Sequence, residues 1–271
     1  MVVETLEFRY IVLFFIVLIS SCSRQIINPA TIDNNASTQI SAHPCADISA
    51  TSDNVHVLNI ALALANYDRY QREVKVTQEH LAFHEVIYAQ IQKRLESGVG
   101  MRGDSDLIQV YLDRARISQI KALGDLKSAR LAYLLNSGEN ASDTMPLPVL
   151  SIEEMKKIID IKLDDKQNLN LPKIKQLSCW NAFQQSADSN KVWARVVKYT
   201  KRLKKGYQKQ FNIGRRSLVN ILDVGADLLE AQIQYENSRF LNIQSAYHLL
   251  AQNGSLKQAL KEARQNASLT H

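Results

Sequence analysis

Histidine and cysteine carry the most reactive side chains of this chain, and their spacing does not assemble a reactive centre. The histidines are scattered, and no group of them has the spacing of metal ligands: they lie at positions 43, 56, 80, 84, 248 and 271. His80 and His84 are four residues apart and would share one face of a helix. Two solvent-exposed helix histidines are the better interpretation, so we expect no metal site.

The three cysteines are Cys22, Cys45 and Cys179. Cys45 and Cys179 could pair in an oxidising compartment, although nothing in their spacing demands it. The sequence shows no glycine-rich phosphate loop after a strand and no convincing nucleophile arrangement. We therefore expect no catalytic residue and no cofactor, and the sequence disfavours an enzyme.

The first 22 residues have the pattern of an export signal. The apolar run YIVLFFIVLI is too short to span a bilayer comfortably, and the sequence Ile-Ser-Ser-Cys overlaps its end. This sequence resembles the lipobox of bacterial lipoproteins, which implies that the Cys22 thiol is acylated and anchors the protein to a membrane. The following Ser23 is compatible with the outer membrane. An ordinary cleaved signal with an incidental cysteine is the alternative, because two glutamates and only one arginine precede the run.

Nine glycines and five prolines in 271 residues are too few turn-forming residues for a fold built on sheets. We therefore expect an all-α protein with long amphipathic helices. The expected divisions are a signal (1–22), a flexible tether (23–56), a first helical hairpin (57–138), a linker with a short helix (139–175), a second hairpin (176–256) and a polar tail (257–271).

Glycine spacing reveals an internal repeat. The interval from Gly98 to Gly138 is 40 residues, and so is the interval from Gly214 to Gly254. We expect hairpin tips at Gly98, Gly100 and Gly214, where the chain reverses and needs a positive φ or a close backbone approach. The last long helix carries a heptad seam typical of packing on one or two neighbours. A four-helix bundle within one chain is the alternative.

Two segments resemble the hairpin tips of TolC-type outer-membrane channel proteins, with the type I secretion components most similar: LAFHEVIYAQIQKRLESGVGMRGDSDL and YQKQFNIGRRSLVNILDVGADLLEAQIQYENSRF. The resemblance implies a trimer whose coiled-coil hairpins close into a periplasmic conduit and dock an adaptor of an inner-membrane pump. Members of the family also carry membrane β-strands. No segment here has their length and alternation, so we expect a shortened relative.

The same resemblance assigns roles near the tips. Asp104 and Arg216 match a gating acid and its arginine partner, and Phe211 stands where the family has a gating tyrosine. Asn220 and Asp223 match two acidic rings that line the entrance, so one ring would be neutral here. The alternative is that Asp104 and Ser217 simply cap their helices.

Between Asp188 and Asp223 the sequence has ten Lys or Arg residues and no acid. Because the export signal places this segment in the periplasm, nucleic acid is not an expected partner, and a basic helix face turned to solvent is the preferred interpretation. Two functions remain open. The first is an outer-membrane efflux or type I secretion channel component, and the second is a lipid-anchored periplasmic coiled-coil interaction protein, or a remnant that forms no pore.

Overall fold

The computed structural model describes residues 45, 52–141, 147, 149–159 and 171–269, which belong to one compact unit of the chain. Within these ranges lie six α-helices and no strand: α2 (Ser52–Glu96), α3 (Arg102–Ser137), α4 (Ile152–Ile158), α5 (Leu171–Asn212), α6 (Leu218–Gln252) and α7 (Leu256–Leu269). None of these helices combines the length and the apolar character needed to cross a bilayer. The predicted signal and Cys22 lie outside the described residues, as does the predicted tether apart from Cys45 and the first turn of α2.

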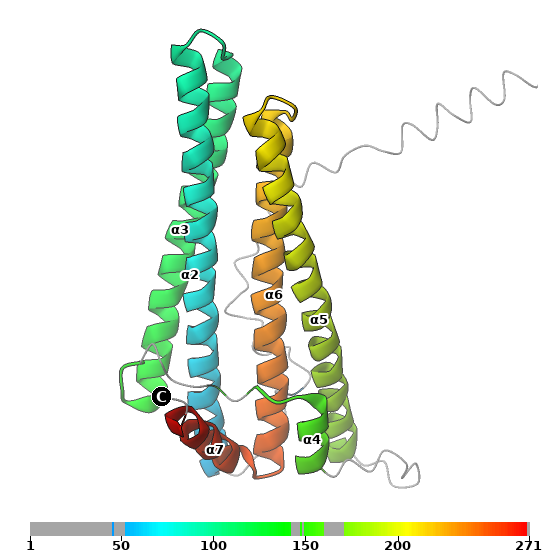
Figure 1. The fold of residues 1–271 in the computed structure, drawn as a ribbon. Coiled ribbons are helices and arrows are strands. Elements are labelled where there is room, and N and C mark those ends of the chain that lie inside the picture. Colours follow the sequence, from blue (N-terminus) through cyan, green and yellow to red (C-terminus); the bar gives the residue numbers. More distant parts are fainter. Residues whose placement is uncertain (1–44, 46–51, 142–146, 148, 160–170, 270–271) are drawn as a thin grey trace, which may run out of the picture. The chain divides into compact units, whose positions relative to one another are not determined.

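The four long helices pair in sequence order (Figure 1). α2 and α3 form an antiparallel hairpin, hairpin 1, and α5 and α6 form hairpin 2. α2 also packs along α6, so the helices follow one another in the order α3, α2, α6, α5. The expected all-α fold of two long antiparallel hairpins is confirmed.

The regular glycine spacing has a structural cause, because each long helix ends at one of these glycines. Gly98, Gly138, Gly214 and Gly254 have φ angles of 73° to 75°, and no other described residue has a positive φ. After α2, Gly98 N donates to Leu95 O and Val99 N donates to Arg94 O. This is the Schellman pattern, which satisfies the last carbonyls of a helix and favours glycine at the left-handed position. The same pattern recurs at Gly214 and Gly254.

Two apolar clusters hold the hairpins together at their opposite ends. The tip cluster contains Phe83, Ile87, Ile91, Ile108, Phe211, Leu218, Ile221, Leu222 and Val224. The base cluster surrounds Trp180, Phe183, Met155 and Tyr247, and α4 and α7 contribute to it. Burial of this kind contributes about 25 cal/mol per Å² of apolar surface. Each cluster contains residues of both hairpins, so this burial stabilises the contact between them.

Charged side chains join α2 to α6 between the two apolar clusters. Arg239 Nη1 lies 2.7 Å from Asp68 Oδ2, and Arg72 Nε lies 3.1 Å from the same oxygen. Burial alone would raise the pKa of Asp68, but the hydrogen bonds from Arg72 and Arg239 outweigh it and lower that pKa. Glu236 also faces Arg239, and burial raises its pKa. The contact between the hairpins is therefore polar in its middle and apolar at both ends.

Several element boundaries differ from the sequence expectation. α2 begins at Ser52 and α5 at Leu171, each five residues before the expected start. α7 occupies the segment described as a polar tail, where its apolar side packs into the base cluster through Leu256. The short linker helix α4 begins with a capping box in which Ser151 and Glu154 bond each other's backbone N–H groups.

Cys45, which belongs to the predicted tether, forms a disulfide with Cys179 of α5. Both residues are fully buried in the base cluster, and the bond links positions 134 residues apart. A cross-link over such a long interval restricts the unfolded chain strongly.

We predict that replacing both cysteines, in Cys45→Ser/Cys179→Ser, lowers the free energy of unfolding by roughly 2–5 kcal/mol, because the unfolded chain regains that freedom. Urea unfolding followed by circular dichroism measures the loss. Reduction of the wild-type protein should produce the same change, and reduction of the double variant should add nothing. An unchanged unfolding midpoint in both experiments would contradict a stabilising disulfide.

Candidate functional site

The tips of both hairpins expose apolar side chains. Val99 and Met101 at the first tip are 79% and 70% exposed, and Ile213 at the second is 65% exposed. Gly100 lets the chain pass close to the end of α2, since a Cβ there would lie 2.8 Å from Leu95 N. The turns that the glycines permit therefore place three apolar side chains in solvent at the tips.

Arg94 joins the two tips, and sequence reasoning did not find it. Its Nη2 donates to the carbonyl oxygen of Phe211 over 3.1 Å, and its guanidinium lies 4.6 Å from the centre of the Phe211 ring. Phe211 is 1% exposed and belongs to the tip cluster. In the sequence, Arg94 is recognisable only as one of two basic residues in the last turn of α2. A basic residue there interacts favourably with the helix dipole, which gives no sign that its side chain contacts the second hairpin.

Of the three residues assigned to a gate, Asp104, Phe211 and Arg216, the two charged ones make no ion pair with each other among the described residues. Arg216 Nε donates to Gln210 Oε1 over 3.0 Å, and its guanidinium lies 3.8 Å from the Tyr207 ring centre.

The capping alternative is correct for one tip only. Ser217 is the N-cap of α6, and its Oγ accepts from the backbone N–H of Asn220. The N-cap of α3 is Met101, which makes no side-chain capping bond, and Asp104 lies in the first turn of that helix. Asp104 therefore interacts favourably with the helix dipole without capping the helix.

Asn220 and Asp223 lie on an exposed side of α6, and the structure adds a third residue, Asp227. Asp223 Oδ1 accepts from the Tyr111 hydroxyl over 3.2 Å, which ties it to α3. Burial and the nearby Asp223 carboxylate raise the pKa of Asp227. The four-residue interval between the two acids was the available signal for Asp227, because such residues lie on one face of a helix.

His80 and His84 are buried, and the expectation of two exposed helix histidines was wrong. They are 9% and 0% exposed, and their Nε2 atoms lie 3.1 Å apart. α6 reaches this face of α2 at Gly225, where a Cβ would meet the Phe83 ring at 2.5 Å. The expectation failed because the hydrophobic periodicity of α2 does not show that α6 covers His80 and His84.

A lysine from hairpin 2 faces the same region. Lys204 Nζ lies 3.6 Å from the centre of the Phe83 ring. Burial, followed by the charge of Lys204, lowers the pKa of His80 to about 4. Burial, His80 and Lys204 lower the pKa of His84 to about 3. Both histidines are therefore neutral near pH 7, and burial also lowers the pKa of Lys204 to about 8. Within the described ranges no group of three or more ligand-type residues could hold a metal ion.

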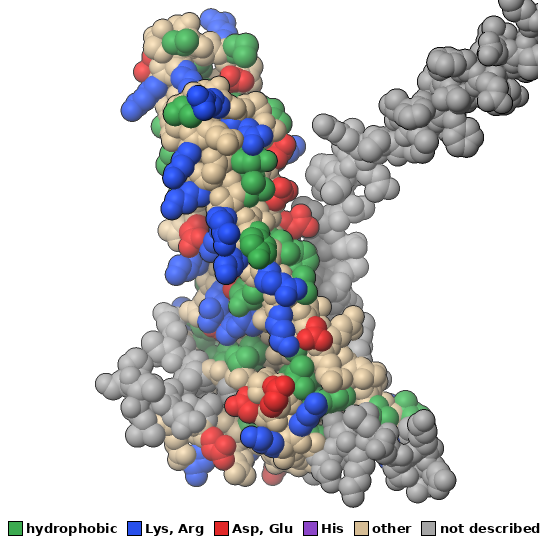
Figure 2. Space-filling view, turned by 45° about the vertical axis from the view of Figure 1, so that its right-hand side comes forward, with side chains coloured by type: hydrophobic (Ala, Val, Ile, Leu, Met, Phe, Trp, Pro, Cys, Tyr) green, Lys and Arg blue, Asp and Glu red, His purple; other side chains and the backbone are tan. Residues whose placement is uncertain are grey.

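The basic segment of α5 is largely exposed, in agreement with the preferred interpretation of a solvated face. Figure 2, which brings the α5 side of the molecule forward, shows Lys and Arg side chains along much of the length of this face. The exposed members are Lys191, Arg195, Lys198, Lys201, Arg202, Lys205 and Lys209. Apolar Val192, Tyr199 and Leu203 are exposed among them.

Solved structures with a similar fold are membrane channels and a further membrane protein. The chain is similar to a membrane protein from Pseudomonas aeruginosa with a TM-score of 0.60 and 12% identity, over 74% of this chain and 68% of that one. It is similar to CusC with a TM-score of 0.52 and 13% identity, over 74% of this chain and 77% of that one. For the Campylobacter jejuni CmeC outer membrane channel the TM-score is 0.57 with 11% identity, over 79% of this chain and 66% of that one.

No family model and no curated protein matches the sequence. At these identities the structural similarity establishes a shared fold, the helical hairpin fold of TolC-like channels.

We predict that Arg94→Ala loosens the contact between the tips, because it removes one of the two donors to the Phe211 carbonyl oxygen and uncovers the ring; the backbone N–H of Gly214, which stays within hairpin 2, remains as the other donor. Hydrogen exchange of the amides at 207–218 should become about tenfold faster, as expected for the loss of a hydrogen bond from a charged group. Arg102→Ala is the control, since Arg102 is exposed at the same tip. Equal exchange in the two variants would contradict the role of Arg94.

We predict that the histidine pair makes the fold sensitive to mild acid. Because the folded pKa values lie below the ordinary value of about 6.5, protonation favours states in which the hairpins separate or unfold. The stabilising contribution is complete above pH 6.5 and decreases as the pH falls toward 4, by up to roughly 3 kcal/mol per pH unit for the pair. Thermal unfolding between pH 7 and 5 measures it, and this window avoids most carboxylate titration.

The groups facing the pair are Lys204 with its neighbour Glu79, and Tyr111 with its partner Asp223. His80→Gln/His84→Gln should flatten the pH dependence of stability, whereas His56→Gln at an exposed position should leave it unchanged. If the His80→Gln/His84→Gln variant kept the wild-type pH dependence of stability, the histidine pair would not be the source of that dependence.

Proposed function

We propose that this chain is a protomer of an outer-membrane efflux or type I secretion channel, anchored through Cys22. Its hairpins would form part of a periplasmic conduit, and its tips would dock an adaptor of an inner-membrane pump. The observation that carries the proposal is the exposure of apolar side chains at both hairpin tips, on a fold that resembles outer-membrane channels. The conduit has no covalent chemistry, which agrees with the lack of an enzyme-like residue pattern.

The edges of the helix row support a homo-oligomer, for which we propose a trimer. α3 and α5 stand at the two ends of the row, so each has a face that no other described helix covers. Val110, Ile117 and Leu131 follow a heptad spacing on α3, and each is 47–66% exposed. Val192 and Tyr199 of α5 also lie seven residues apart and are exposed. Such seams bury themselves against a partner helix, and a second copy supplies one.

The same arrangement gives the charged tip residues a function between copies. Asp104 lies at the start of α3, and Arg216 lies beside Tyr207 at the end of α5. If α3 of one copy meets α5 of the next, the two charges come together at the mouth. An exposed pair contributes only about 0–1 kcal/mol, which suits a closure that must open.

The exposed acids of α6 would line the conduit. Asn220 makes one level of this lining neutral, whereas Asp223 and Asp227 supply two acidic levels below it. A ring of carboxylates attracts cations. We therefore propose a cation preference that depends on Asp223 and Asp227, with Asn220 contributing polarity and no charge.

We predict that the tips contact the adaptor directly. A photo-crosslinking amino acid at Val99 or Ile213 should capture a periplasmic adaptor protein produced together with this chain, and the same residue at Leu135 should not. Leu135 is a matched control because it is 85% exposed and lies near the opposite end of α3. Equal capture at the three positions, or capture only at Leu135, would contradict tip docking.

We predict that reversing either gate charge loosens closure and that reversing both restores it. Asp104→Arg and Arg216→Asp should each raise the conductance of the purified oligomer in planar bilayers by up to about fivefold, because one ion pair is lost at each boundary. The double variant should return toward the wild-type value. Additive increases in the double variant would show that the two residues do not pair.

A further inference from the structure

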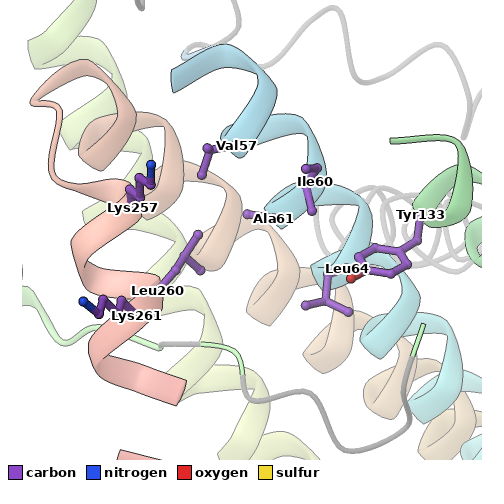
Figure 3. A pocket seen from close by; sticks show the side chains of 8 residues that line it. All are labelled: Val57, Ile60, Ala61, Leu64, Tyr133, Lys257, Leu260 and Lys261. Atoms are coloured by element: carbon purple, nitrogen blue, oxygen red, sulfur yellow. The ribbon is translucent and has the colours of Figure 1, made fainter. Parts of the chain in front are cut away.

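A cavity far from the tips lies between α7 and hairpin 1. Its volume is about 350 Å³, and its lining comes from three helices (Figure 3): Val57, Ile60, Ala61 and Leu64 of α2, Tyr133 of α3, and Lys257, Leu260 and Lys261 of α7. Its apolar wall borders the base cluster, to which Ala61 belongs, but no residue of α6 or of the hairpin tips lines it. The docking and conduit roles proposed above therefore leave it unexplained.

The floor of the cavity is hydrocarbon. Ala61 and Leu64 are buried, Val57 and Ile60 are half-buried, and Leu260 closes the α7 side. Most of the lining carries no polar group that could fix a polar ligand. Its volume is near the lower end of the range of small-molecule sites, roughly 300–1,000 Å³. This size and lining suit one hydrocarbon chain better than a bulky or polar molecule.

The rim on the α7 side is cationic. Lys257 and Lys261 are four residues apart, so they occupy one face of α7, and both are exposed. Figure 3 shows their stems beside Leu260, with the nitrogen atoms turned away from the apolar floor. Among the ion pairs of the described residues none involves either lysine, and the nearby Glu262 accepts a hydrogen bond from Gln258.

We propose that this cavity binds a single-chain anionic lipid of the fatty-acid class. The acyl chain would occupy the apolar floor, and the carboxylate would lie between the ammonium groups of Lys257 and Lys261. Long lysine side chains can keep their stems on apolar surface while the charged ends reach a headgroup. Because the lining comes from α2, α3 and α7, the bound lipid would link α7 to hairpin 1. This inference does not rest on the transport function.

The test is a binding titration of the full chain with a dansyl-labelled medium-chain fatty acid, kept below its micelle concentration, and with its uncharged methyl ester. The wild-type protein should bind the acid about tenfold more tightly than the ester, as two partly exposed ion pairs provide. Lys257→Gln/Lys261→Gln should remove that preference. Val57→Phe, which adds bulk at a half-buried lining position, should weaken binding of both probes.

The matched control is Lys201→Gln/Lys205→Gln, which removes two exposed lysines with the same four-residue spacing on α5. It should retain the wild-type preference, and circular dichroism should show all variants equally folded. Lys257→Glu/Lys261→Glu should instead favour an alkylammonium probe of the same chain length. No probe binding to the wild type, equal affinity for acid and ester, or an unchanged preference in the Lys257→Gln/Lys261→Gln variant would overturn the proposal.

Discussion

The packing of α2 against α6 is the contact on which the rest of the structure depends, because among the described helices it alone joins the two hairpins along their length. It has apolar clusters at both ends and charged groups between them. Gly225 lets α6 approach the Phe83 ring, and the approach buries His80 and His84 beside it. Asp68, Arg72, Glu236 and Arg239 form one partly buried network, so each charge in the middle of the seam has an opposite charge beside it. The apolar ends of the seam supply most of the attraction.

This contact also determines which surfaces remain for partners. Since α2 and α6 occupy the middle of the row, α3 and α5 become its edges and keep exposed apolar positions at heptad spacing. The left-handed glycines end the helices of each hairpin at matching points, which brings the two tips level enough for Arg94 to reach Phe211. Edge and tip surfaces are thus consequences of one intramolecular arrangement, and the proposed assembly and docking use them separately.

The sequence predicts the hairpins well because their signals are local. A glycine after an amphipathic stretch identifies a helix end, and equal intervals between such glycines identify two similar hairpins. The heptad seam predicted for the last long helix included Leu222, Ala226, Ile243, Tyr247 and Leu250, and all of these except Ala226 are buried. Leu228, which the seam did not include, is buried as well. α6 contacts both α5 and α2, so its buried side is wider than a single stripe.

Features that depend on contacts between distant segments were not predictable in the same way. The disulfide joins residues 134 positions apart, and spacing only permitted it. The contact of Arg94 with Phe211 and the burial of His80 and His84 depend on which helix faces which, and no local pattern records that. α7 shows the same limit: its composition is polar, yet Leu256 becomes fully buried once the base cluster forms.

We propose that copies of this chain close into a ring through contact of α3 with α5. Cysteines at Ile117 and Tyr199, both exposed and on opposite edges of the row, test it most directly when the protein is oxidised in membranes and separated without reductant. A head-to-tail ring predicts that the double-cysteine variant forms a ladder that ends at a closed trimer, while each single variant stays uncrosslinked. Crosslinking of either single variant into dimers, or no crosslinked product from the double variant, would contradict the ring.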